Sequence, residues 1–303
     1  MYKNRAYIIK TKTNLHVGAD GTNFGIVDKE VQRDSISNLP IINGSSLKGA
    51  IREHFRDMLA TTNELEIDSQ KVKPFVFRTI FGEKQKELDE EDTKTYSKLP
   101  KHGLVKFIDA KLLFLPLRSN IRPFYHTTSI SNLKSMVEFL KSFGISIEID
   151  NISDIKRSVV IGDSEAIVED VECKAHNIDI SLIKELFGVE NLAIFTDEDF
   201  NEAVSNLPII ARNKIATNAD RTDGNLWYEE MIPRESILYT ILCYYDNLDD
   251  DTVDRRGRTD RRKFENSYRL FDNKLLKDDI QIGANASIGY GICNFSILGV
   301  DDE

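Results

Sequence analysis

The chain has 303 residues, of which 41% are hydrophobic, so it can bury a sizeable core. Charged residues make up 30% of the chain, and the excess of acids gives a formal net charge of −10. Taken over the whole chain, this balance argues against a nucleic-acid partner, because phosphates are anionic as well. Charge has to be examined locally, however, since a groove that holds a polyanion needs only a basic stripe.

Basic residues are concentrated in one segment of the chain. Six of the nine residues from 255 to 263 are Lys or Arg, whereas acids gather at 87–92 and 301–303. An isolated run of charge is usually a solvated loop. The basic run alone therefore does not decide between a loop and an RNA-binding stripe.

The cysteines and the lack of long apolar segments indicate the cellular compartment of the protein. Cys173, Cys243 and Cys293 are far apart and odd in number, which supports neither a disulfide framework nor a zinc site, and we expect buried thiols in a reducing environment. No segment is long and apolar enough to span a bilayer, and basic residues interrupt the apolar positions at the N-terminus. We therefore predict a cytoplasmic protein with no membrane partner.

The first third of the chain predicts a strand, a loop and a helix. Residues 5–17 have the composition of a strand and lead into a loop over 18–25 that contains glycine. A helix is expected to begin at residues 43–45, with basic residues at 48, 52 and 56 on a flanking face. Its apolar face consists of Leu47, Ala50, Ile51, Phe55, Met58 and Leu59.

The remaining elements predict an α+β fold. The polar stretch 62–102 is interpreted as an insertion that carries no core. The order of the other elements fits an α+β sandwich better than a doubly wound sheet. Strands are expected over 104–117, 158–171, 207–215, 225–245 and 292–298, and helices over 132–143 and 262–276.

Two segments combine glycines with a change of element, and the first of them could hold an anion. GSSLKG at 44–49 combines a tight turn, the hydroxyls of Ser45 and Ser46, and Lys48 at a helix start, which is the chemistry of an anion site. It departs from a nucleotide-binding P-loop, so the phosphate of a polymer fits better than ATP, and helix capping explains it equally well. QIGANASIGYG at 281–291 is typical of a tight turn.

A histidine and several carboxylates could serve in RNA cleavage. His16 and Asp28 lie on either side of the loop 18–25, and Glu229 and Glu230 are consecutive. If 226–232 is a strand, only one of the two glutamates can face a shared site. RNA cleavage needs no protein nucleophile, because the 2′-hydroxyl attacks its own phosphodiester once a base or a metal-bound hydroxide removes its proton. A lone Asp or His is more often structural.

Seven motifs, in order along nearly the whole chain, resemble the backbone RAMP subunit of the type III-B CRISPR complex, called Cmr. They are LHVG (15–18), GIVDKEVQRD (25–34), LPIINGSSLKGAIR (39–52), DAKLLFLPLRS (109–119), FTDEDF (195–200), NLWYEEMIP (225–233) and QIGANASIGYG (281–291). The fourth and sixth motifs separate this branch from the related type III-A subunit.

This resemblance implies a single domain over 1–303 with a modified ferredoxin-like (RRM-type) palm, a β-hairpin thumb, and insertions at about 62–102 and 145–225. It implies that copies stack along a guide RNA together with other Cmr subunits. It also implies cleavage of the paired single-stranded target RNA beside each flipped base. That cleavage needs a divalent metal ion (Mg or Mn) and leaves 2′,3′-cyclic phosphate and 5′-hydroxyl ends.

The resemblance also assigns roles to residues. Asp28 matches the catalytic aspartate and would hold the metal, His16 matches a nearby histidine, and Glu229 is the expected acidic partner. The thumb is placed at about 197–225. The RNA-binding residues would be Ser45, Ser46, Lys48, Arg52, Gly283, Gly289 and Gly291, with Arg212 and Lys214 in the thumb.

The chain departs from the family pattern at two positions. Gly283-Ala284 replaces a Gly-Gly pair, which is tolerable only if residue 284 does not need a positive φ. Met231 stands where an aromatic residue is expected.

Two other functions remain open at this point. One is a scaffold subunit that grips guide RNA while another subunit cuts. The other is a stand-alone single-strand binder of RRM type, although the aromatic stacking signature of such modules is not seen.

Overall fold

The computed structural model describes residues 2–19, 27–61, 65–67, 70–72, 80–82, 102–149, 155–214, 225–245, 269 and 271–298. The basic run 255–263, both acidic runs and most of the loop 18–25 lie outside these residues. Among the described residues, no helix is both long and apolar enough to cross a membrane.

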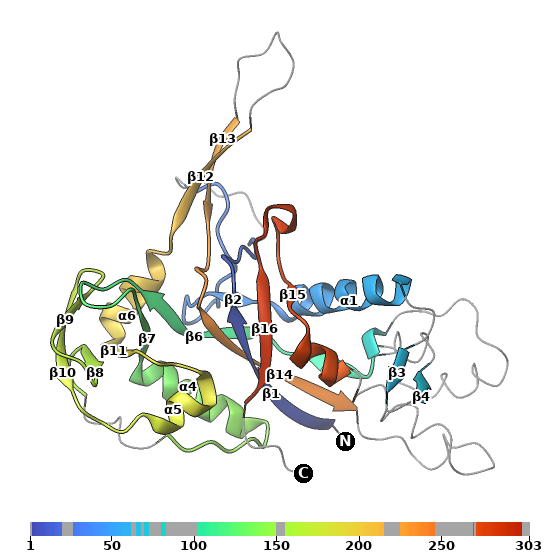
Figure 1. Ribbon diagram of the computed structural model, residues 1–303, viewed down its shortest axis with the longest axis horizontal. Coiled ribbons are helices and arrows are strands. Elements are labelled where there is room, and N and C mark those ends of the chain that lie inside the picture. Colours follow the sequence, from blue (N-terminus) through green and yellow to red (C-terminus); the bar gives the residue numbers. More distant parts are fainter. Residues whose placement is uncertain are drawn as a thin grey trace, which may run out of the picture.

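One large mixed sheet forms the centre of the molecule (Figure 1). Its order is β15-β16-β1-β14-β6-β7-β11-β8-β10-β9, with β2 beside β6 and β5 beside β14. The strands are β1 (Tyr2–Thr11), β2 (Ile41–Ile42), β5 (Val105–Phe107), β6 (Ala110–Leu117), β7 (Tyr125–Ser129), β8 (Val159–Ile161), β9 (Ala166–Val168), β10 (Val171–His176), β11 (Leu192–Phe195), β14 (Ile237–Tyr245), β15 (Ile280–Gln281) and β16 (Ile292–Ile297).

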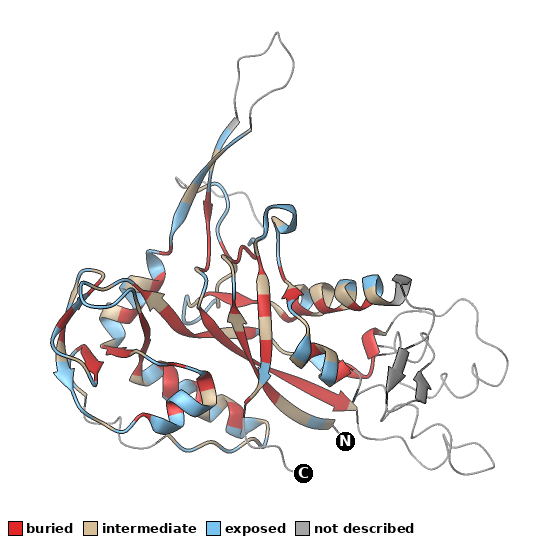
Figure 2. Ribbon diagram, in the orientation of Figure 1, coloured by how far each residue is buried: buried red, intermediate tan, exposed pale blue. Residues whose placement is uncertain are grey.

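The sheet separates two hydrophobic cores, because successive side chains of a strand point to opposite faces. In β1, Tyr7 and Ile9 enter one core, whereas Ala6 and Ile8 enter the other. Figure 2 shows β14 and β6 buried along almost their whole length. The helices α1 (Gly44–Thr61), α6 (Asp197–Ser205) and residues 271–277 cover the first core, and α4 (Ile130–Ser142) and α5 (Ser181–Phe187) cover the second.

Helix α1 begins where the sequence predicts, at Gly44. Leu47, Ile51 and Phe55 follow at helical spacing and are fully buried. The helix therefore presents one apolar face to the sheet and leaves its first turn near the surface.

The helices α4 and α6 begin at hydroxyl caps. Ser129 accepts a hydrogen bond from the Asn132 main-chain N–H, and Thr196 accepts one from that of Asp199. Buried apolar residues then follow at helical spacing, as in Phe200 of α6. The expected helix 132–143 thus starts two residues earlier than predicted, which is within the usual scatter of helix ends.

A two-stranded hairpin projects from the body of the molecule (Figure 1). It pairs β12 (Ile209–Lys214) with β13 (Asn225–Glu230) in antiparallel register. The thumb was expected over 197–225, but residues 197–205 form helix α6 instead. Three acids in the first turn after the Thr196 cap favour a helix there.

The prediction that the stretch 62–102 carries no core is wrong. Ile80 and Phe81 are buried, and the Phe81 ring stacks on Phe107 with a centroid distance of 5.8 Å. It also lies close to Phe55 and Phe271. The mean polarity of residues 62–102 is high, so a short apolar pair such as Ile80 and Phe81 does not stand out in the sequence. Two further short strands in this stretch, β3 (Leu65–Ile67) and β4 (Gln70–Val72), pair with each other.

Several predicted strands are divided or shortened. The expected strand 5–17 ends at Thr11, and the expected strand 104–117 is β5 followed by β6.

The range 145–225, expected as an insertion, contains β8, β9, β10 and β11, which continue the main sheet.

The three cysteines are free and buried, as the sequence predicts. Burial, together with a nearby carboxylate in each case, raises the pKa of Cys173 and that of Cys293 to about 12. These thiols are packing groups at neutral pH.

Candidate functional site

The base of the hairpin is paired with the chain around Asp28. The main-chain N–H groups of Asp28 and Lys29 donate to the Tyr228 carbonyl at 3.0 and 3.1 Å, and Glu230 N–H donates to the Lys29 carbonyl at 2.9 Å. The Asp28 carboxylate in turn accepts a hydrogen bond from Tyr228 N–H at 2.7 Å. Asp28 is exposed to solvent. It is nevertheless held against β13, because its main chain donates a hydrogen bond to Tyr228 and its carboxylate accepts one from the same residue.

Glu229 lies at the centre of a buried network. Asn285 Nδ2 donates to both of its carboxylate oxygens, at 3.0 and 2.9 Å, and Arg212 Nε forms an ion pair with it. His16 Nε2 is 3.6 Å and Lys29 Nζ 4.0 Å from the same carboxylate. The Glu229 side chain is only 1% exposed.

The surroundings of Glu229 favour its ionised form. Burial alone would raise its pKa, but the hydrogen bonds from Asn285 and Arg212, aided by the positive charge nearby, outweigh burial and lower it. The carboxylate is thus a fixed negative charge whose hydrogen-bonding capacity is used by the chain itself.

His16 is buried on the other side of this network. Its Nδ1 lies 2.7 Å from the Glu230 carbonyl oxygen, which can only accept, so Nδ1 carries the proton. Its Nε2 points toward Glu229. Because His16 and Glu229 are both buried, the geometry favours a positioning role for them over direct contact with RNA.

Glu230 points to the opposite face of β13, as the alternation of a strand predicts. Its carboxylate accepts from Val31 N–H at 2.9 Å and forms an ion pair with Arg33. Arg33 also donates to the Val204 carbonyl of α6 at 2.9 Å. Only Glu229 faces His16.

The glycine-rich segment 281–291, called the Gly-rich loop below, closes over this network. Gly283 has a φ of +80°, and a Cβ there would lie 2.3 Å from the His16 carbonyl oxygen, so no larger residue fits. Ala284 is not among the described residues with positive φ, so its departure from Gly is tolerated, and Asn285 takes the left-handed conformation instead, at +65°. Tyr290 places its ring 4.7 Å from the guanidinium carbon of Arg212.

The predicted anion site at the start of α1 is partly used by the chain. Gly44 N–H donates to the Asp109 carboxylate at 2.6 Å, and Ser46 Oγ accepts from Gln32 Nε2 at 3.1 Å. Gln32 Nε2 also donates to the Gly18 carbonyl at 3.1 Å, so this side chain joins α1 to the segment that carries His16. Ser45 remains exposed.

Lys48 lies one turn into α1 and is half-buried. Burial, and then the charge of Arg52, lowers its pKa. Its Nζ is 3.4 Å from the His102 carbonyl.

The structure brings together some of the predicted residues and separates others. His16, Asp28, Glu229, Arg212 and Gly283 meet at the hairpin base. Ser45, Ser46, Lys48 and Arg52 lie along α1, Gly289 and Gly291 lie in the Gly-rich loop, and the Lys214 side chain lies outside the described residues.

Sequence reasoning missed three residues that build the site. Asn285 follows Gly283-Ala284, and an Asn in a glycine-rich turn is a known signal for left-handed backbone. Lys29 and Arg33 have no local sequence pattern that marks them as site residues, because their partners lie far away in the chain. Lys29 Nζ lies 5.3 Å from the centre of the Trp227 ring, and Arg33 pairs with Glu230.

The side chains of the site offer few ligands for a metal ion. Within the described part of the chain, no cluster of three or more His, Cys, Asp or Glu side chains could enclose a metal ion. Asp28 offers an exposed carboxylate, which is the hard oxygen ligand that Mg²⁺ and Mn²⁺ prefer. A single carboxylate fits a cation that is shared with the phosphates of a bound nucleic acid.

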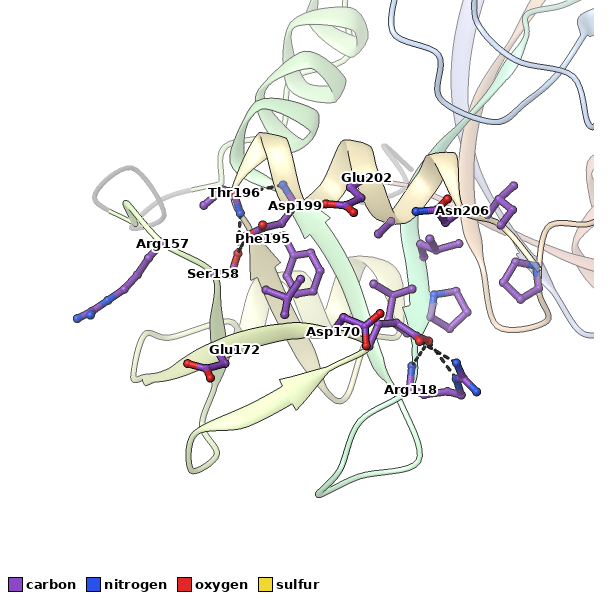
Figure 3. A pocket seen from close by; sticks show the side chains of 18 of the residues that line it. Arg118, Arg157, Ser158, Asp170, Glu172, Phe195, Thr196, Asp199, Glu202 and Asn206 are labelled. Carbon is purple, nitrogen blue, oxygen red and sulfur yellow. Dashed lines mark hydrogen bonds and ion pairs between the residues drawn. The ribbon is translucent and has the colours of Figure 1, made fainter. Parts of the chain in front are cut away.

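A separate cavity of about 960 Å³ lies beside α6, between β6, β8, β10 and β11 (Figure 3). Its wall includes Ser158 bonded to Asp199, and Arg118 paired with Glu169 at 2.8 Å. None of the predicted site residues lines it.

Comparison with known proteins gives consistent matches over the whole chain. The RAMP superfamily model matches residues 8–294. "CRISPR system Cmr endoribonuclease Cmr4" of Pyrococcus furiosus is 26% identical over an alignment of 325 positions, which covers 99% of this chain and 98% of that protein.

Solved structures share the fold. A chain of the type III-B Cmr-beta complex bound to cognate target RNA superposes with a TM-score of 0.69 at 19% identity, covering 98% of this chain and 97% of that one. Oligomeric Cmr4 from Pyrococcus furiosus gives a TM-score of 0.64 at 20% identity, covering 99% and 100%.

Proposed function

Because the chain belongs to the RAMP superfamily, we propose that it is a backbone subunit of a type III-B CRISPR effector, which binds guide RNA and cleaves the paired target RNA. The relative that matches along its full length is named an endoribonuclease of the Cmr system. The single observation that carries the catalytic part is the exposed Asp28 carboxylate, held at the base of the hairpin.

The geometry around Asp28 supports a role in the reaction. A group that takes a proton from a 2′-hydroxyl must be reachable by RNA and fixed in position. Asp28 meets both conditions, since its side chain is exposed and its backbone and carboxylate are bonded to Tyr228. Glu229 and His16, which are buried behind it, hold the hairpin base in register.

In the proposed reaction, the 2′-oxygen of the target attacks the adjacent phosphorus while Asp28 accepts the 2′-proton. The bond from phosphorus to the 5′-oxygen breaks, and that oxygen leaves as a hydroxyl once protonated. The products are a 2′,3′-cyclic phosphate and a 5′-hydroxyl. Asp28 would hold the divalent ion (Mg or Mn), which would supply a positive charge that lowers the pKa of the 2′-hydroxyl.

The RNA-binding part of the proposal rests on α1 and the hairpin. Ser45, Lys48 and Arg52 lie on the first turns of α1, and Arg212 lies on β12 of the hairpin, where it is paired with Glu229. Lysine and arginine side chains suit a phosphate backbone without regard to its sequence.

The topology supports a modified ferredoxin-like palm. In chain order β1, α1, β6, β14, the helical residues 271–277 and β16 form a βαββαβ succession, and the sheet order of those strands is β16-β1-β14-β6. Both helices pack on the same face. We propose that copies of this palm stack along guide RNA with other Cmr subunits, consistent with the oligomeric crystal structure of the relative.

The catalytic assignment is tested with Asp28→Asn in complexes assembled on guide RNA. The variant keeps the shape of the side chain and removes its charge. Target cleavage measured under single-turnover conditions should fall by about 100-fold or more, as for the loss of a general base, while guide and target binding persist. Arg118→Gln, which breaks an exposed ion pair with Glu169, is the control for assembly.

A non-catalytic scaffold is the other function that this experiment addresses. If Asp28→Asn complexes cut at the normal rate, the chain binds guide RNA while another subunit cuts. If they neither assemble nor bind guide RNA although the control does, Asp28 has a structural role and the catalytic assignment fails.

A further inference from the structure

Two side-chain contacts join the Gly-rich loop to the projecting hairpin. Asn285 donates to both carboxylate oxygens of Glu229 in β13, and Tyr290 places its ring against the guanidinium of Arg212 in β12. Arg212 and Glu229 are also paired with each other across the hairpin. One loop therefore contacts both strands of the hairpin at its base.

The loop itself is anchored to the body of the molecule. Ala284 N–H donates to the His16 carbonyl at 2.9 Å, and Gly291 N–H donates to the Asn14 carbonyl at 2.8 Å. Gly283 and Gly291 leave no room for a Cβ against neighbouring backbone. The loop is thus held in place just after β1, whereas the described part of the hairpin projects from the body and is attached to it at its base (Figure 1).

Asp28 depends on the same part of the hairpin. Its carboxylate and its main-chain N–H both bond to Tyr228, the residue next to Glu229, and Lys29 pairs with Glu229. A shift of β13 relative to the body therefore carries Asp28 with it. Displacement of a reacting group by about 1 Å is enough to cost about 100-fold in rate.

The buried charge of Glu229 gives the contact its strength. A carboxylate that is removed from water needs hydrogen bonds on both oxygens, and Asn285 supplies one to each. Because Asn285 is in the left-handed conformation, its backbone directs the amide toward β13 at little steric cost, as Asn tolerates that region.

We propose that the Gly-rich loop acts as a clamp that sets the position of the hairpin base and of Asp28, with Asn285 and Tyr290 as positioning residues for the cleavage reaction. This inference rests on the proposed function for its catalytic consequence. The clamp itself is a property of the chain and can be measured without any RNA.

The first test is Asn285→Gly, which removes the amide and still accepts the positive φ. In assembled complexes with saturating target RNA, single-turnover cleavage should fall about tenfold or more, and the affinity for target should be unchanged. In hydrogen–deuterium exchange of the full chain, the amides of Asp28 and Lys29 should exchange faster, while those of β1 and β14 keep their protection. Ser287→Ala, an exposed position in the same loop, is the matched control.

Substitutions of Tyr290 test the clamp independently. Tyr290→Leu removes the ring beside Arg212 and should speed exchange at residues 28–29, whereas the conservative Tyr290→Phe retains the ring and should restore protection. A loss of protection with both substitutions would show that the ring contact is not what holds the hairpin.

The outcomes separate the clamp from the proposed function. Unchanged exchange at residues 28–29 in Asn285→Gly overturns the clamp, whatever happens to cleavage. Faster exchange there with an unchanged cleavage rate removes the positioning role. If Asp28→Asn complexes cleave normally, the proposed function fails, and the exchange measurement still decides whether the loop holds the hairpin.

Discussion

Glu229 and Glu230 are adjacent in sequence, but their carboxylates point to opposite faces of β13 and pair with different arginines, Arg212 and Arg33. The first pair faces the Gly-rich loop and His16. The second joins β13 to the chain after Asp28 and, through Arg33, to α6. The two glutamates should therefore respond differently to substitution.

Glu230→Gln should reduce stability more than a surface substitution does. It leaves the Arg33 guanidinium largely buried without its carboxylate, and breaking a buried pair costs about 3 kcal/mol. The unfolding midpoint in urea should fall accordingly. Glu172→Gln, at an exposed position of β10, should change stability by no more than about 0.5 kcal/mol. Equal midpoints for the two variants would contradict a structural role for the Arg33 pair.

Gly289→Ala and Gly291→Ala form a matched pair within the Gly-rich loop. Both residues have a φ near +80°, so an added Cβ is strained at both by about 1 kcal/mol. At Gly291 the Cβ would also lie 1.9 Å from the Ile282 carbonyl oxygen, whereas Gly289 faces open space. Thermal denaturation should show a clearly larger loss for Gly291→Ala. If Gly289→Ala alone weakens RNA binding, that glycine lies where a phosphate approaches.

Lys48→Ala should weaken RNA binding equally for all sequences. A phosphate contact contributes charge without sequence information, so the salt dependence of log K should fall by about one unit. Titrations of assembled complexes at several salt concentrations give this slope. Lys141→Ala, on the exposed part of α4 across the sheet, should leave the slope unchanged. An unaltered slope for Lys48→Ala would place that residue outside the RNA groove.

His126 should make stability depend on pH. Its Nε2 contacts the Glu235 carbonyl at 3.1 Å, and burial, followed by the charge of Lys10, lowers its pKa to about 4. The unfolded chain, with a pKa near 6.5, binds the proton first as pH falls, so stability is lost between about pH 6.5 and pH 4 and levels off below. The loss attributable to this residue is about 3 kcal/mol.

Urea denaturation across that pH range measures the effect. His126→Gln removes the titrating group and should flatten the curve between pH 6.5 and pH 4, whereas His176→Gln, at an exposed position, should not. If the free energy of unfolding of the wild-type chain does not change between pH 6.5 and pH 4, the pKa of His126 is the same in the folded and unfolded states, and the prediction is wrong.

Local signals were enough to predict α1 and the alternation of β13. The start at Gly44 and the spacing of Leu47, Ile51 and Phe55 define the helix without reference to any other part of the chain. A strand has period two by geometry, so opposite faces for Glu229 and Glu230 follow from the sequence alone.

The contacts that assemble the site could not be predicted in the same way. Asn285 reaches Glu229, and Lys29 pairs with Glu229, only because β1, β14 and β16 are neighbours in the sheet. Nothing local in the sequence encodes which strands pair. The thumb boundary is a different kind of error, because the Thr196 cap and the three acids after it are local signals for a helix that the prediction of a thumb over 197–225 overlooks.

The neighbours of β1 have a consequence for how the protein is made. Strand β1 is hydrogen-bonded on one edge to β14 and on the other to β16, the last strand of the described chain. Both partners lie far downstream of β1, so the nascent chain must carry β1 as an unpaired apolar strand until β14 and β16 have been synthesised. A polypeptide truncated before residue 292 would lack β16 and would leave one edge of β1 without its partner, and an exposed strand edge of this kind promotes aggregation.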